Sequence, residues 1–223
     1  MIKIYQPQGP QRYEEILVMQ RQLFDEMVAE KRATGRVNDE HLISVEHLPV
    51  ITLGRRAHHE NLLISEDMLK ARNIDVFRIE RGGDITYHGP GQIVMYPLID
   101  LEHYHLGVKD YVNLLEEAVI LTLKYYGIEG ERVEGATGVW IDKDTPHERK
   151  ICAIGVKCSR FITMHGLALN VNTELSPFTL INPCGFVDKG VTSIAKELNH
   201  PVDYAEATHQ LRHNFLTLLN SHT

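Results

Sequence analysis

The segment VWIDKDTPHERKICAIGVKCSRFITMHGLALNV, residues 139–171, contains three short apolar runs separated by polar connections. The runs are rich in β-branched residues and have the length of strands. DKDTPHER and CSR between them are polar turns of the kind that join hairpins. The pattern therefore predicts an antiparallel meander, and the runs HLISVEH, PVITLG and IDVFRI earlier in the chain predict further strands.

Helical periodicity flanks these strands on both sides. Apolar residues from Tyr13 to Val28 repeat near 3.6 and predict an amphipathic helix that ends at Gly35. A second helix is predicted over residues 110–126, a short one over 193–198, and a longer one that starts at Asp203. This grouping predicts an α/β (α+β) fold in one domain, residues 1–223, with no linker long enough to separate two.

Composition excludes several classes of function. The chain of 223 residues has 23 Lys and Arg against 30 Asp and Glu, a net charge of −7, so it lacks the basic footprint of a nucleic-acid-binding protein. No apolar run approaches the ~18 residues of a membrane span, and the first residues lack the pattern of a secretory signal. Three cysteines, an odd number, indicate reduced thiols. We expect a cytoplasmic protein.

The most unusual segment is RGGDITYHGPGQ, residues 81–92, with four glycines and a proline between two predicted strands. Such a loop allows the backbone to approach a ligand closely, because glycine has no Cβ. The alternative is a pair of tight turns. The segment has neither the GxGxxG nor the GxxxxGK[ST] spacing of a phosphate-binding loop.

The thiols differ in their surroundings. Cys184 lies in the polar segment INPCG and is a candidate nucleophile, whereas Cys152 and Cys158 lie in a predicted strand and are expected to be small core residues. The 13 histidines lack HExxH or CxxC partners, so we expect no metal site and a surface rich in histidine. His88 and His165, each beside a glycine, are instead expected to shape the site, with a core position as the alternative for His165. The GxSxG motif of serine hydrolases is also missing.

Five stretches together resemble one family: ITLGRR (51–56), RIERGGDITYHGPGQIVMYPLIDL (78–101), KICAIG (150–155), MHGLALNV (164–171) and INPCG (181–185). The chain is similar to the lipoyl(octanoyl) transferases, which move an octanoyl group from acyl carrier protein to a lysine of a lipoyl domain. The resemblance implies the fold of biotin and lipoate protein ligases, with a mixed sheet around an acyl tunnel. It implies no cofactor, since the acyl group arrives on the phosphopantetheine of the carrier protein.

The resemblance also implies roles for individual residues. Cys184 would form the acyl thioester and Lys150 would activate it. The substrate-binding residues implied are Arg81, Gly82, Gly83, Asp84, Ile85, Thr86, Tyr87, His88, Ala153, Ile154, Gly155, Gly166, Leu167 and Ala168.

These residue types suit acyl transfer. A thiol with the usual pKa of ~8.5 is a few per cent thiolate at neutral pH, so the nucleophile needs a partner. Lys150 can act as a cation beside the sulfur or as a neutral base, and the sequence leaves both open. The acceptor lysine must also lose a proton, which Lys150 could take.

Both protein partners implied by the resemblance, octanoyl-acyl carrier protein and the lipoyl domains of 2-oxoacid dehydrogenase E2 subunits and the glycine cleavage H protein, are acidic. We therefore expect a local basic patch formed by Arg55, Arg56, Arg78, Arg81 and Lys157. Two alternatives remain open at this point: an ATP-dependent lipoate or biotin ligase, and a non-catalytic module that binds acyl groups or lipoyl domains.

Overall fold

A twisted eight-stranded sheet forms the centre of the computed structural model, which describes residues 1–182 and 189–222. Its strand order is β1-β2-β6-β10-β9-β8-β7, and β11 pairs with β9. The strands are β1 (Ile2–Tyr5), β2 (Glu40–Val45), β6 (Gln92–Leu98), β7 (Glu131–Val133), β8 (Ala136–Ile141), β9 (Arg149–Ser159), β10 (Ile162–Asn170) and β11 (Gly190–Val191). The β1–β2 and β9–β11 pairs are parallel and the other pairs are antiparallel, so the sheet is mixed.

The predicted meander is confirmed as β8, β9 and β10. The turn between β9 and β10 falls one residue later than the sequence suggested, because β9 continues through Ser159, which pairs with Ile162. Arg160 and Phe161 form the turn with φ of 51° and 65°. Two successive positive φ values match the twist of flanking strands, so this short turn keeps the two longest strands in register.

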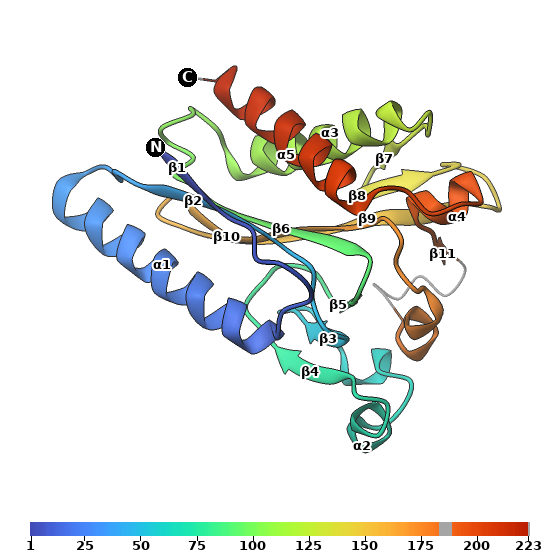
Figure 1. Cartoon of the computed structure of the whole chain (residues 1–223). Coiled ribbons are helices and arrows are strands. Elements are labelled where there is room, and N and C mark those ends of the chain that lie inside the picture. The colour runs from blue at the N-terminus through green and yellow to red at the C-terminus, as the bar shows by residue number, and fades with distance from the viewer. Residues whose placement is uncertain (183–188, 223) are drawn as a thin grey trace.

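Two of the strands expected in the N-terminal half, PVITLG and IDVFRI, form a second sheet with a strand that was not expected. This third strand, Ile85–His88, lies within the segment RGGDITYHGPGQ that was predicted to be a loop, because its residues pair with Val50–Leu53. Here β3 (Val50–Leu53) lies between β4 (Asp75–Arg78) and β5 (Ile85–His88). The short helix α2 (Glu66–Lys70) and the 3-10 turns His59–Asn61 and Ser176–Leu180 accompany this small sheet, which lies below the main one in Figure 1.

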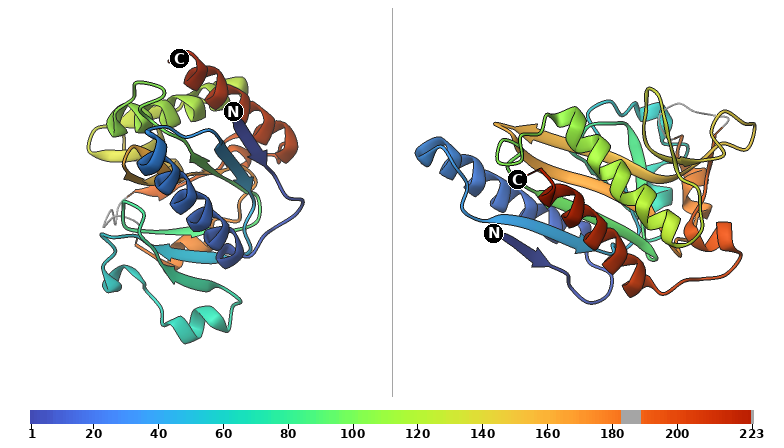
Figure 2. Two further views of the ribbon diagram at one scale, coloured as in Figure 1. Left: turned by 90° about the vertical axis from the view of Figure 1, so that its left-hand side faces the viewer. Right: turned by 90° about the horizontal axis from the view of Figure 1, so that it is seen from above.

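Helices cover the two faces of the main sheet differently. The helices α3 (Val108–Tyr125) and α5 (Tyr204–Asn220) lie together on one face, and α1 (Tyr13–Thr34) lies on the other beside the small sheet (Figures 1 and 2). The short helix α4 (Ile194–Leu198) precedes α5. The predicted helix ends are confirmed: Gly35 is left-handed after α1, and the side chain of Asp203 caps α5.

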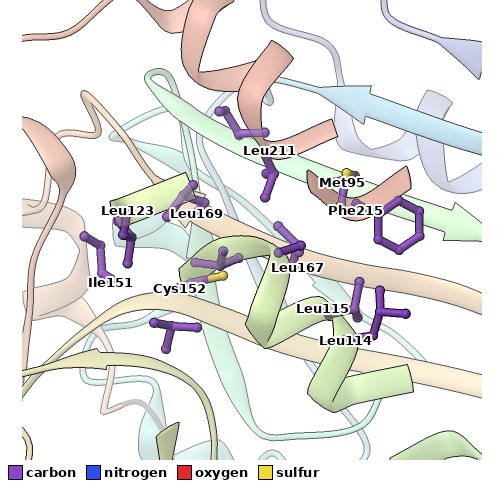
Figure 3. Close-up of a cluster of buried hydrophobic side chains, with 14 of the residues drawn as sticks. Met95, Leu114, Leu115, Leu123, Ile151, Cys152, Leu167, Leu169, Leu211 and Phe215 are labelled. Carbon is purple, nitrogen blue, oxygen red and sulfur yellow. The ribbon is translucent and has the colours of Figure 1, made fainter. Parts of the chain in front are cut away.

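The largest core lies between the sheet and the α3/α5 pair (Figure 3). Leu115 and Leu123 of α3 and Phe215 of α5 pack there against Leu167 and Leu169 of β10, all of them buried. Each such side chain stabilises the fold by about 1.5–3 kcal/mol relative to exposure. This face is therefore filled by packed side chains. No helix in residues 1–182 and 189–222 is both long and apolar enough to span a membrane.

Candidate active site

A cavity of about 730 Å³ lies between the main sheet and the small sheet. Its walls come from β9 and β10, the RGGDITYH segment, the N-terminal end of α1 and the residues that follow the 183–188 segment. Of the predicted substrate-binding residues, these line it: Arg81, Gly82, Gly83, Asp84, Ile85, Thr86, His88, Ala153, Ile154, Gly155, Gly166, Leu167 and Ala168. Tyr87 is the exception, because its buried ring packs against Phe178 among the apolar residues of the small sheet.

The floor of the cavity consists of small residues at paired positions. Ala153 pairs with Ala168, and Gly155 pairs with Gly166, on the neighbouring strands β9 and β10. The methyl groups of Ala153 and Ala168 leave a shallow channel along the sheet, whereas the space beside Gly155 and Gly166 is taken by the carbonyl oxygens of Gly82 and Met95. The motifs AIG and HGLA thus provide an apolar floor with room for a chain of methylenes.

The roof over this channel is the start of the RGG segment. The backbone N–H of Gly82 donates to the carbonyl of Val156 at 2.9 Å. A Cβ on Gly155 would lie 2.7 Å from the Gly82 carbonyl oxygen, too close for any other residue type. The two glycines therefore allow the roof to contact the floor directly.

Arg81 fixes the roof from inside the molecule. Its side chain is buried, and its guanidinium donates to the carbonyl oxygen of Thr52 at 2.7 Å and to the Thr52 hydroxyl at 3.0 Å. The expectation that Arg81 belongs to an exposed basic patch is therefore wrong. Arg55, Arg56 and Arg78 are exposed, and Arg56 reaches the cavity mouth.

Lys150 lies at the other end of the channel, beside an irregularity in the sheet. Val139 pairs with Cys152 but Trp140 pairs with Lys150, so β9 carries one extra residue at this point. Such a bulge redirects side chains. The ammonium of Lys150 donates to the carbonyl of Thr137 at 3.2 Å and lies 4.5 Å from the centre of the Trp140 ring.

Gly138 makes this path possible. It has a φ of 122°, and a Cβ there would lie 2.4 Å from the carbonyl oxygen of Cys152 and 3.5 Å from Cε of Lys150. The lysine side chain therefore runs along a position that only glycine leaves open. The aliphatic stem follows β8 and the ammonium ends over the indole ring, a favourable arrangement for a cation.

The predicted nucleophile Cys184 lies outside the described residues, but both flanks of its segment are placed at the cavity. On one side, the backbone N–H of Asn182 donates to the carbonyl of Asn61 at 2.8 Å. On the other side, Lys189 lies 5.0 Å from the Trp140 ring, and Gly190 and Val191 pair with Arg149 and Lys150. The described residues on the two sides thus lie at Asn61 and beside Lys150.

A group of buried aromatic and histidine side chains closes the inner part of the cavity. His88 stacks on Tyr13 and donates from Nδ1 to the side-chain amide oxygen of Gln92 at 2.8 Å. His47 contacts the hydroxyl of Tyr96 through Nε2 at 2.9 Å. Burial lowers the pKa of His47 to about 4 and that of His88 to about 3, so both rings are neutral near pH 7.

His165 is buried in the same region and, like His88, lines the cavity. The expectation of a surface position is wrong for His47, which is fully buried. His47 and His88 are held inside by contacts with Tyr96, Tyr13 and Gln92, which lie on other elements or in the same buried group. The interpretation of Cys152 as a core residue is confirmed. It is fully buried, and burial raises the pKa of its thiol well above the usual range, while Cys158 is partly buried against the same core.

Several residues of the site carried no recognisable signal in the sequence. Trp140, Lys189, Asn61 and Tyr13 line the cavity from elements far apart in the chain. Asn61 also donates from its amide to the Asp84 carboxylate at 2.6 Å, which connects the roof segment to the residue that receives Asn182. The one available hint was Trp140, the only tryptophan of the chain, two residues after a glycine.

Known structures with the same fold are lipoate protein ligases. The chain matches the crystal structure of lipoate-protein ligase A bound with ATP with a TM-score of 0.70 at 18% identity, covering 98% of this chain and 85% of that one. It matches a bipartite lipoate protein ligase from Thermoplasma acidophilum equally well, with a TM-score of 0.70 at 18% identity, covering 98% and 83%. The fold class is therefore that of the lipoate and biotin ligase-like proteins, as predicted.

Comparison of the sequence with protein families identifies the family within this fold class. The model of the lipoyl protein ligase A/B catalytic domain matches residues 12–216, and the chain belongs to this family. Octanoyltransferases from Parabacteroides distasonis and Bacteroides thetaiotaomicron are each 53% identical, over 96% and 93% of this chain and 97% and 91% of theirs. An octanoyltransferase from Porphyromonas gingivalis is 54% identical, and the chain spans 44% of its length.

Proposed function

We propose that this protein transfers an octanoyl group from acyl carrier protein to a lysine of a lipoyl domain, through a thioester on Cys184 that Lys150 helps to form and to resolve. The identity of about half the residues to octanoyltransferases over nearly the whole chain supports the octanoyl transfer. The observation that carries the role of Lys150 is its position at one end of a channel of small residues, where it pairs with Val191 on the C-terminal flank of the Cys184 segment.

In the first half of the reaction, the Cys184 sulfur attacks the carbonyl carbon of the octanoyl thioester. The bond from that carbon to the phosphopantetheine sulfur breaks, and Lys150 passes the thiol proton to the leaving thiolate. The octanoyl chain lies over the part of the channel floor formed by Ala153 and Ala168. Backbone amides at the site stabilise the tetrahedral oxyanion.

In the second half, the ε-amine of the acceptor lysine attacks the Cys184 thioester. An amide bond forms, the carbon–sulfur bond breaks, and the proton lost by the amine passes through Lys150 to the cysteine sulfur. The acceptor amine, with a pKa near ~10.4, is neutral in roughly one molecule in a thousand at pH 7, so a proton acceptor at this position accelerates the step.

The proposed partners follow from this reaction: octanoyl-acyl carrier protein as donor, and lipoyl domains of E2 subunits and the H protein as acceptors, in the cytoplasm and without a cofactor. Arg55, Arg56 and Arg78 provide exposed positive charge for acidic partners, and Arg56 lines the cavity. Lys157 is less available, because its ammonium lies 3.4 Å from the Glu80 carboxylate and 4.5 Å from the ring of Phe24.

The test is a single-turnover assay with purified octanoyl-acyl carrier protein, followed by intact-mass analysis and then by addition of a lipoyl domain. The proposal predicts an octanoyl adduct in the wild type that disappears when the lipoyl domain is added. Lys150→Ala should slow both halves by at least 100-fold. Pyrophosphate release from ATP and octanoate, with no adduct, would instead establish an ATP-dependent ligase.

A further inference from the structure

The inner end of the channel contains buried polar groups that the reaction does not use. His165 lines the cavity and is 1% exposed, and neither of its ring nitrogens has a hydrogen-bond partner among the described residues. Gln20 of α1 is fully buried behind it and accepts the backbone N–H of His165 at 3.3 Å. The amide nitrogen of Gln20 also has no partner in the described part of the chain.

An unusual backbone conformation places the imidazole of His165 close to α1. His165 has a φ of 62° in the middle of β10, a conformation that is unfavourable for residues other than glycine and uncommon within a strand. Without this turn its side chain would point with Leu167 and Leu169 toward the α3/α5 core. The strain therefore places a polar ring where the apolar channel ends.

Burial lowers the pKa of His165 to about 3, so the ring is neutral, with one N–H donor and one acceptor nitrogen. Charged groups surround it from three elements: Arg21 on α1, Glu80 and Arg81 before β5, and Lys157 on β9. A buried donor and acceptor without protein partners are satisfied by water or by a polar ligand group, and contact with methylenes alone leaves them unsatisfied.

The distance from the reacting end matches the length of the acyl chain. The ammonium of Lys150 contacts the carbonyl of Thr137 on β8. Because β8 and β9 are antiparallel and Val139 pairs with Cys152, Thr137 lies opposite Ile154 of β9. His165 pairs with Val156, two residues further along β9 and two strands away from Thr137. Strand spacings of about 3.3 and 4.8 Å place their backbones about 12 Å apart.

An extended octanoyl chain has seven carbon–carbon bonds and spans about 9 Å, and its carbonyl carbon would lie about 3 Å from the group that assists the reaction. Its terminal methyl thus arrives at His165. Each further methylene would gain about fourfold in affinity in an apolar channel, so size alone gives weak selection between chains. Where the channel ends at polar groups, each further methylene lowers the affinity instead of raising it.

We propose that His165, supported by Gln20, forms a polar end to the acyl channel that sets the chain length. An acyl group longer than octanoyl would displace the water that hydrogen-bonds these buried groups and leave them unsatisfied. The inference rests on the proposed octanoyl transfer. It assigns His165 a role in specificity and none in the chemical step, and it explains why a neutral buried histidine occupies a strained position.

The test is an internal competition with equimolar octanoyl- and decanoyl-acyl carrier protein in one reaction, in which the masses of the modified lipoyl domain give the ratio of the two kcat/KM values. His165→Phe keeps a ring of similar size without polar atoms, and the expected result is a decanoyl-to-octanoyl ratio raised by at least fivefold and up to about 15-fold. His105→Phe is the matched control, because His105 is exposed and also has a positive φ of 55°. It should leave the ratio unchanged.

A second variant keeps the inference testable if the first folds poorly. Gln20→Met removes the amide at nearly constant volume and should raise the ratio at least threefold, with Gln22→Met on the exposed face of α1 as its control. Ratios within twofold of the wild type in both variants would overturn the inference, and so would a folded His165→Phe variant that has lost octanoyl transfer. If the wild type transfers neither chain, the proposed function fails instead.

Discussion

Acid conditions should destabilise this protein sharply between pH 7 and pH 5, because three histidines are buried without charge. His47, His88 and His165 are 0%, 6% and 1% exposed, and burial lowers their pKa values to about 4, 3 and 3. In the unfolded chain each has a pKa near ~6.5 and binds a proton that the folded protein does not bind. The stability they provide is therefore present above pH 6.5 and falls as the pH drops toward 4.

The size of the effect follows from linkage. At pH 5 an unfolded histidine is stabilised by protonation by about 2 kcal/mol, whereas a folded one with a pKa at or below 4 gains almost nothing. Three such groups lower the free energy of unfolding by about 5–6 kcal/mol between pH 7 and pH 5, a large part of the ~5–15 kcal/mol of a typical domain. Glu80, with its pKa lowered to about 2 chiefly by Arg21, matters only below this range.

Urea unfolding at a series of pH values measures the change directly. His165→Asn should reduce the loss by about one third, about 2 kcal/mol, because asparagine tolerates a positive φ and does not titrate. His105→Asn should leave the loss unchanged, since His105 is exposed. A total loss below about 2 kcal/mol, or a loss that His165→Asn does not alter, would refute the reasoning.

Three further predictions concern the site. Gly138→Ala should lower the free energy of unfolding by about 1–3 kcal/mol and reduce octanoyl transfer more than tenfold, since its Cβ would meet the Cys152 carbonyl beside Lys150. Thermal unfolding measures the loss of stability and a transfer assay the loss of activity. Gly135→Ala is the control, because the space there is open, and it should keep activity. Arg81→Lys should destabilise the fold by about 1.5–3 kcal/mol and impair transfer, because lysine cannot reproduce the forked contact with Thr52; unimpaired stability in urea would count against this role of the guanidinium. Cys152→Ser should lower stability by about 1–3 kcal/mol but retain transfer, since the thiol is buried in the core; loss of the acyl adduct in a folded Cys152→Ser protein would show that the wrong thiol had been assigned.

The helices and the meander could be predicted because their information is local. The 3.6-residue period of α1, the Asp203 cap of α5 and the polar turns around β9 each lie within a few residues of the element they define. The separate sheet β4-β3-β5 could not be predicted, because alternation within a strand does not say which strand it pairs with. Non-local pairing is what places the RGG segment over the Gly155 floor.

Part of the site was predictable from the sequence in the same way as the helices and the meander. The motif residues of β9 and β10 meet at one channel because their register pairs alanine with alanine and glycine with glycine. The burial of Arg81 was not foreseeable, since arginine is usually exposed and this one is held inside by its contacts with Thr52. A core position was one of two expectations for His165, but its contact with Gln20 of α1 depends on tertiary packing. The contact of Trp140 with both Lys150 and Lys189 likewise depends on strands that are distant in sequence.

The most direct test of the central claim is peptide mass mapping after the protein is mixed with octanoyl-acyl carrier protein and quenched before acceptor is added. We predict that the octanoyl group is found on the peptide containing Cys184, that it is lost in Cys184→Ser, and that it persists in Cys152→Ser and Cys158→Ser. An octanoyl group that remains on Cys184→Ser, or that is transferred to the lipoyl domain by this variant at the wild-type rate, would contradict the account.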